Sequence, residues 1–253
     1  MQTMPIRCFL DLETTATSKR AGVIQLAAAI DDPNRKGVKS QAFQSQVMPF
    51  PEADKTEATA KFHGYESLDA AMADWSTYPH PSRVYTAFGN FLDSFVSRYG
   101  KNKTVKLHMI GYNILNFDEP VLRHWFKCLK DNFAPGCWFW QSPIDVMALA
   151  AEHLIDRRAE MENFQLATVA ETLGISVDKS QLHGALYDVA LTRAVYYQIR
   201  KEKANGDQSH SVKRGEEPER EPQEGNVSGS SRKDGDGTGG VSFTDQLRAA
   251  LNG

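Results

Sequence analysis

Apolar and polar positions along the chain alternate between strand and helix patterns as far as about residue 200. Residues 6–15 and 23–30 are predicted as strands, the second being a continuous apolar run typical of a strand covered on both faces. The short connection between them favours an antiparallel hairpin. Weaker strand patterns follow at 38–48 and 107–111. The pattern therefore predicts an α/β fold.

Apolar residues three and four positions apart predict the helices, most clearly at 83–99. Pro120 fits the first turn of another helix, which places Asp118 at or beside its N-cap, and by itself this pattern is typical of a capping aspartate. Phe117, just before it, is predicted to lie in the core. Further helices are predicted at 52–62, 68–75, 144–154, 165–173 and 184–199.

The composition changes after residue 200. Residues 201–240 contain almost no apolar side chains, so burial cannot offset their chain entropy. We expect one domain at 1–200 followed by a disordered linker at 201–240. Residues 241–253 recover an apolar pattern and predict a short amphipathic helix, which either docks on a partner protein or folds back on the domain.

Net charge and cysteine content indicate which classes of protein the chain can belong to. The formal charge of −3 argues against coating nucleic acid by bulk electrostatics, although it leaves room for a local basic groove. The three cysteines form no CxxC pair and are expected to be reduced thiols. Because the chain lacks a membrane-span pattern and a signal-peptide pattern, we expect a cytoplasmic protein.

Two acidic residues at the end of the first strand are the starting point for the chemistry. Asp11 and Glu13 are two positions apart, so in an extended strand their side chains point to the same face. Two carboxylates this close resist ionisation unless a cation lies between them. The pair therefore predicts a metal site that folding completes with ligands from elsewhere.

Three motifs supply those ligands and carry a family resemblance. DLETT stands at 11–15, GYNILNFDEPVL at 111–122 and HGALYDVALT at 183–192. In this order they resemble the DnaQ-like exonucleases of the DEDDh type, whose fold is ribonuclease H-like, and the second motif resembles its form in bacterial exonuclease I. The resemblance covers about residues 6–200. It implies a mixed five-stranded sheet flanked by helices.

The resemblance also implies roles for five residues. Phosphodiester hydrolysis by this family uses two divalent ions, Mg²⁺ or Mn²⁺, bound by hard oxygen ligands. Asp11 would bridge both ions, Glu13 and Asp188 would complete the site of the ion that holds the attacking water, and Asp118 would support the second ion. His183 would be the general base, because a neutral imidazole exchanges protons near neutral pH.

Two more residues are candidates for contacting the substrate. By resemblance, Thr14 would contact the 3′ hydroxyl of the terminal nucleotide. His63 is either a surface histidine or a substrate contact. Where the family often has glycine, this chain has Ala16, which leaves open the shape of the pocket for the terminal base. Trp138, Phe139 and Trp140 are expected to pack under a loop, with stacking on bases as the alternative.

The expected function is a metal-dependent 3′–5′ exonuclease that releases nucleoside 5′-monophosphates from the 3′ end of single-stranded nucleic acid, with DNA favoured over RNA. An exoribonuclease that acts on RNA ends or short oligoribonucleotides is the first alternative, because one metal site serves both sugars. A polymerase-associated proofreading module, or a module that binds nucleic acid without cleaving it, is the second. The intact set of four acids and His183 favours an enzyme.

Overall fold

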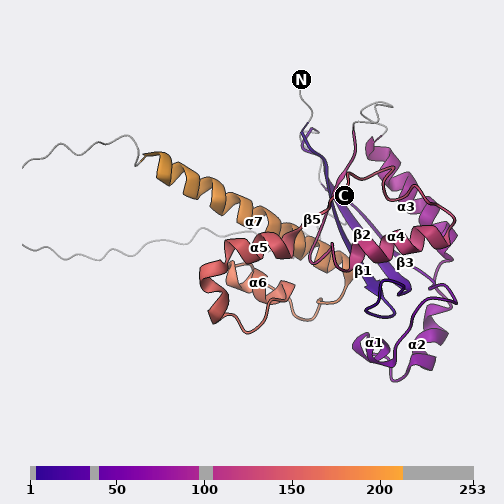
Figure 1. The fold of residues 1–253 in the computed structure, drawn as a ribbon. Coiled ribbons are helices and arrows are strands. Elements are labelled where there is room, and N and C mark those ends of the chain that lie inside the picture. The colour runs from indigo at the N-terminus through magenta and orange to yellow at the C-terminus, as the bar shows by residue number, and fades with distance from the viewer. Residues whose placement is uncertain (1–3, 35–39, 97–104, 213–253) are drawn as a thin grey trace, which may run out of the picture.

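A mixed five-stranded sheet forms the centre of the fold (Figure 1). The computed structural model describes residues 4–34, 40–96 and 105–212. In the strand order β3-β2-β1-β4-β5, β2 is antiparallel to β1 and β3, whereas β4 is parallel to β1 and β5. The predicted ribonuclease H-like α/β class is confirmed. The strands are β1 Arg7–Thr14, β2 Val23–Asp31, β3 Gln41–Gln46, β4 His108–Gly111 and β5 Ile144–Asp145.

Helices cover both faces of the sheet, and the alternation along β1 shows which face carries the acids. Leu10 and Leu12 pack in the core cluster that contains α3 (Pro81–Val96) and α4 (Asp118–Cys128). Phe9 packs in a second cluster with α5 (Val146–His153), α6 (Leu166–Thr172) and α7 (Ala185–Val212). Because strand residues alternate between faces, Asp11 and Glu13 share the face of Phe9. The two acids therefore lie on the α7 side.

The segment after β3 differs from the prediction. A helix was expected at 52–62, but α1 spans only Glu57–Phe62, whereas α2 spans Leu68–Trp75 as predicted. Thr56 is the N-cap of α1, with its hydroxyl accepting the N–H of Thr59. Ahead of it, the ammonium group of Lys55 binds three carbonyl oxygens of residues 50–53, which holds this stretch in a turn. The start of α1 is therefore fixed by a hydroxyl cap.

The last helix continues past the predicted domain boundary. α7 runs to Val212, so residues 201–212 are helical where a linker was predicted. Glu202 explains part of this, because its carboxylate lies 2.6 Å from Nε2 of His153 on α5. The rest of the predicted linker and the peptide 241–253 lie outside the described residues. Within the described residues, no helix is long and apolar enough to cross a membrane.

Candidate active site

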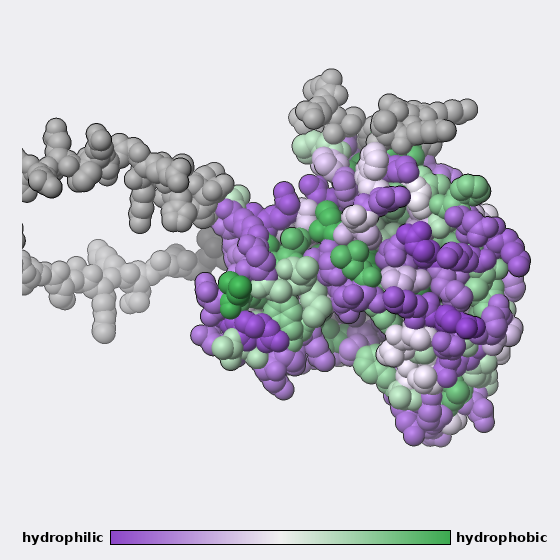
Figure 2. All heavy atoms as spheres, viewed as in Figure 1, coloured by the Kyte–Doolittle hydropathy of each residue, from purple (hydrophilic) through white to green (hydrophobic). Residues whose placement is uncertain are grey.

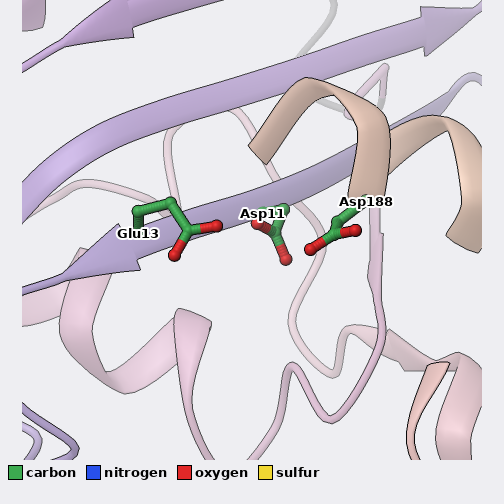
Figure 3. A group of neighbouring side chains, drawn as sticks. All are labelled: Asp11, Glu13 and Asp188. Atoms are coloured by element: carbon green, nitrogen blue, oxygen red, sulfur yellow. The ribbon is translucent and has the colours of Figure 1, made fainter. Parts of the chain in front are cut away.

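Three acidic side chains from opposite ends of the chain meet at the carboxyl end of β1 (Figure 3). Asp11 and Glu13 come from β1 and Asp188 from the first turns of α7, and one carboxylate oxygen of each lies within 4.8 Å of the others. Oδ1 of Asp188 is buried and accepts no hydrogen bond from the described residues. Hard oxygen donors with an unpaired buried oxygen among them fit a divalent cation such as Mg²⁺ or Mn²⁺.

The electrostatics of the cluster favour a bound cation. Burial, reinforced by the carboxylates of Asp118, Glu13 and Asp188, raises the pKa of Asp11 well above its usual range. Burial and the neighbouring acids raise the pKa of Glu13 to about 8. Burial also raises the pKa of Asp188 to about 6, although the nearby His183 opposes this. The folded state is therefore least stable when all three carboxylates are ionised and no cation is bound between them.

Asp118 lies beside these three acids but binds a different partner. Its Oδ1 accepts the N–H of Leu12 at 2.9 Å, and only 3% of the residue is exposed. β4 stops pairing with β1 at Phe9, so Leu12 lies beyond the paired part of that edge. Burial raises the pKa of Asp118 to about 7, and the bond from Leu12 opposes the shift. The side chain is therefore turned toward β1 and is not a helix cap, and one of its oxygens is already occupied.

The N-terminal end of α7 is attached to the sheet by a side chain that the sequence analysis did not single out. Gln25 lies opposite Glu13 on β2, and its Oε1 accepts the N–H of Ala185 at 3.0 Å. His183 precedes this helix in the left-handed region, with φ of 67°. Its imidazole is exposed and lies edge-on to the Phe62 ring, with 4.4 Å between centroids. Gln25 thus positions the turn that carries His183 and the helix that carries Asp188.

His63 is half-buried between α1 and β1. Its Nε2 donates to the carbonyl oxygen of Thr14 at 3.0 Å, and its Nδ1 lies 4.0 Å from Oε2 of Glu13. Burial lowers the pKa of His63 despite the bond to Thr14. The position of His63 excludes a free surface histidine, the first of the two interpretations that the sequence left open.

An apolar cavity of about 340 Å³ adjoins the acidic cluster between β1 and α1. Phe117 lines this cavity and is only partly buried, so the prediction that it belongs to the core is wrong. Ala16, which stands where the family often has glycine, also lines the cavity. Thr14 also lines the cavity, and its Oγ1 donates to the carbonyl oxygen of Ala16 at 2.8 Å. The other apolar walls are Leu12, Ala58 and Phe62.

A buried threonine joins α1 to the end of β1. Oγ1 of Thr15 accepts the N–H of Gly22 at 2.8 Å and donates to the carbonyl oxygen of Asp54, while its own carbonyl accepts the N–H of Thr56 at 3.0 Å. Gly22 is required there, because a Cβ would lie 2.6 Å from Cβ of Pro49. This network fixes the segment that carries the cavity wall.

Comparison with known proteins gives structural matches alone. No family model matches the chain, and no curated protein is similar enough in sequence to count as a relative. A structure of E. coli exonuclease I in complex with a 5cy-dT13 oligonucleotide is 21% identical over 79% of this chain and 41% of its own, with a TM-score of 0.53. Exonuclease I from Methylocaldum szegediense is 19% identical over 78% of this chain and 41% of its own, again with a TM-score of 0.53.

A shorter structure gives a higher structural score. Cell-death related nuclease 4 has a TM-score of 0.59 at 15% identity, over 79% of this chain and 65% of its own. The chain thus spans about two-fifths of the exonuclease I structures and somewhat less than two-thirds of this one. What these matches establish is that the chain shares the fold of exonuclease I and of cell-death related nuclease 4.

Proposed function

We propose that the chain is a metal-dependent 3′–5′ exonuclease that removes nucleoside 5′-monophosphates from single-stranded nucleic acid, with DNA preferred to RNA. The observation that carries the proposal is the convergence of Asp11, Glu13 and Asp188 at one point beside an apolar cavity. The fold shared with exonuclease I, which has been solved with dT13 and dA13 oligonucleotides, supports the choice of substrate.

The acidic cluster would hold two divalent ions, Mg²⁺ or Mn²⁺. Asp11, Glu13 and Asp188 supply the ligand oxygens, and Asp118 supports the site from beside Leu12. Such ions lower the pKa of water and stabilise the charge that develops on the phosphate oxygens. The raised pKa values of Asp11 and Glu13 support cation binding, because a bound cation reduces the repulsion between the ionised carboxylates.

His183 acts as the general base. It accepts a proton from the attacking water while the water oxygen forms a new bond to phosphorus. The bond from phosphorus to the 3′ oxygen of the preceding nucleotide breaks, and that oxygen leaves with a proton from solvent. Asp188, five residues later at the start of α7, stabilises the imidazolium that forms. Contact with the Phe62 ring limits the rotation of the imidazole.

The apolar cavity receives the terminal nucleotide. Phe62 and Phe117 offer their rings to the base, a contact that all four bases can make. Because Thr14 lines the cavity and its hydroxyl donates to the Ala16 carbonyl, its Oγ1 remains an acceptor for the 3′ hydroxyl. His63 contributes by holding the Thr14 carbonyl in place and by facing Glu13.

The proposal is tested with 5′-labelled DNA and RNA strands of the same sequence, incubated with Mg²⁺, with Mn²⁺ and with EDTA. We expect shortening by one nucleotide at a time with either metal and none in EDTA. Asp11→Asn abolishes it, whereas Glu171→Gln on the exposed side of α6 does not. Full metal-dependent activity of Asp11→Asn contradicts the proposal. Faster shortening of RNA assigns an exoribonuclease, and binding without shortening assigns a non-catalytic module.

A further inference from the structure

A second cavity opens between α4 and the segment 135–143, and its volume is about 220 Å³. Glu119 and Arg123 of α4 line one side of it, and Trp140 lines the other. The cavity starts one residue beyond Asp118. From Asp118 to Arg123 the helix advances by about 7.5 Å, at 1.5 Å per residue. Trp140 is hydrogen-bonded to Leu107, which lies level with Ile6, five residues before Asp11 on β1. The Trp140 side of the cavity is therefore about 16 Å from the acidic cluster along the sheet, at 3.3 Å per residue, and the cavity shares none of the cluster's residues.

Trp140 forms the aromatic wall, and its backbone is held against the start of β4. The backbone N–H of Trp140 donates to the carbonyl oxygen of Leu107 at 3.0 Å, and the backbone N–H of Leu107 donates to the carbonyl oxygen of Trp138 at 2.9 Å. Unlike the neighbouring Trp138 and Phe139, which are buried as predicted, Trp140 is 40% exposed. The Lys106 ammonium lies 5.7 Å from the centre of the Trp140 ring. A partly exposed indole on a held backbone, beside a cation, suits stacking of an aromatic ligand.

The charges around this cavity are mainly positive. Arg123 and Lys127 on α4 are exposed, as is Lys130 two residues after its end. Figure 2, which shows the face that carries this helix, has hydrophilic residues across it. Glu119 is the one acidic residue in the cavity wall, and it is already hydrogen-bonded to Arg123. Although the whole chain has a formal charge of −3, this surface is complementary to a polyanion.

We propose that this cavity is a second nucleic-acid subsite. It binds a nucleotide upstream of the reacting 3′ end, with the base stacked on Trp140 and the phosphates along Arg123 and Lys127. The inference rests on the proposed function, because it assumes that a single strand already occupies the acidic cluster. Aromatic stacking combined with cations along a track is the usual arrangement for binding single strands without sequence preference.

Binding is measured first, without divalent metal, so that no hydrolysis occurs. The fluorescence anisotropy of a 5′-labelled single-stranded DNA 12-mer gives the Kd in EDTA. We expect Trp140→Ala to raise it by roughly five- to a hundred-fold, and Trp140→Phe to restore most of the affinity. Ile155→Ala, which removes another exposed apolar side chain outside the cavity, is the control and leaves the Kd unchanged. An unchanged Kd for Trp140→Ala overturns the proposal.

The salt dependence of binding tests the phosphate contacts. Arg123→Ala and Lys127→Ala each reduce the slope of log affinity against log salt concentration by about 0.7, as expected for one phosphate contact on a single strand. Lys179→Ala, which removes a cation paired with Glu171 on another surface, leaves the slope unchanged. Equal slopes for all four proteins exclude Arg123 and Lys127 from the binding track.

Turnover then separates this inference from the proposed function. The ratio of KM between Trp140→Ala and wild type is expected to grow from a dinucleotide to a 12-mer, because the longer strand alone reaches the cavity. If the wild type releases no mononucleotides with metal present, the proposed function fails. If the wild type is active and the KM ratio is the same for both lengths, the second subsite alone is refuted.

Discussion

Replacing Glu13 with glutamine removes one negative charge from the acidic cluster while keeping the size of the side chain. Only 14% of the Glu13 side chain is exposed, and its pKa is raised from 4.5 to about 8. The folded protein therefore binds this proton more tightly than the unfolded chain does. Stability that is fully present below pH 4.5 is lost as the pH rises through 8. Glu13→Gln should not show that loss.

The size of the effect follows from the shift. A change in pKa from 4.5 to about 8 corresponds to about 5 kcal/mol of folding free energy above pH 8. For a domain of this size, that is equivalent to roughly 10–20 °C in Tm. We expect Glu13→Gln to melt higher than the wild type by such an amount at pH 9 without metal. At pH 4 the two proteins should melt together.

Circular dichroism melts between pH 4 and pH 9, in EDTA and then with Mg²⁺ or Mn²⁺, measure this difference. Metal should stabilise the wild type by roughly 2.7 kcal/mol at a hundred-fold excess over Kd, and should stabilise the variant less. Glu171→Gln, on an exposed surface, is the control and should follow the wild type at every pH. Equal melting of Glu13→Gln and wild type at pH 9 in EDTA would refute the electrostatic account of the site.

Substitutions at three further positions test other parts of the site. His183→Ala should lower kcat by roughly 10²- to 10⁴-fold, and because the side chain is exposed, the urea midpoint should stay at the wild-type value. Asp118→Ala leaves the Leu12 N–H without its acceptor and should lower the free energy of unfolding, measured in urea, by roughly 1–3 kcal/mol. Asp118→Asn keeps an acceptor for that N–H, so it should lose activity without losing stability. Gln25→Leu removes the acceptor of the Ala185 N–H, so both unfolding free energy and kcat should fall; unchanged kcat would contradict its positioning role.

Local patterns predicted the elements that carry the chemistry. The apolar runs around β1 and β2 were sufficient to place both strands, because a central strand buries nearly every residue. The two-residue spacing of Asp11 and Glu13 predicted a shared face, and Asp188 joins them there. The proximity of Asp188 itself came from the family motif, since nothing in the spacing of residues 177 positions apart specifies contact.

What the sequence could not predict depends on contacts between distant segments. From its own helix, Asp118 is predicted to be a capping residue. Its observed orientation is explained by the hydrogen bond that it accepts from the N–H of Leu12, 106 residues earlier. Gln25 reads as a polar interruption of an apolar strand, yet it binds the first turn of a helix 160 residues later. The exposure of Phe117 to the cavity could not be predicted either, because a cavity between β1 and α1 forms only when both segments are in place.

The contact between Gln25 and Ala185 has a consequence for when activity can arise. α7 brings the third carboxylate to the site, and it is the last element of the described fold. A partly unfolded chain whose final helix has not docked keeps the acids of β1 and Asp118, but lacks Asp188 and the proposed proton acceptor His183 at the site. Under the proposed function, catalytic competence would therefore depend on the docking of α7, which makes it a readout of completed folding.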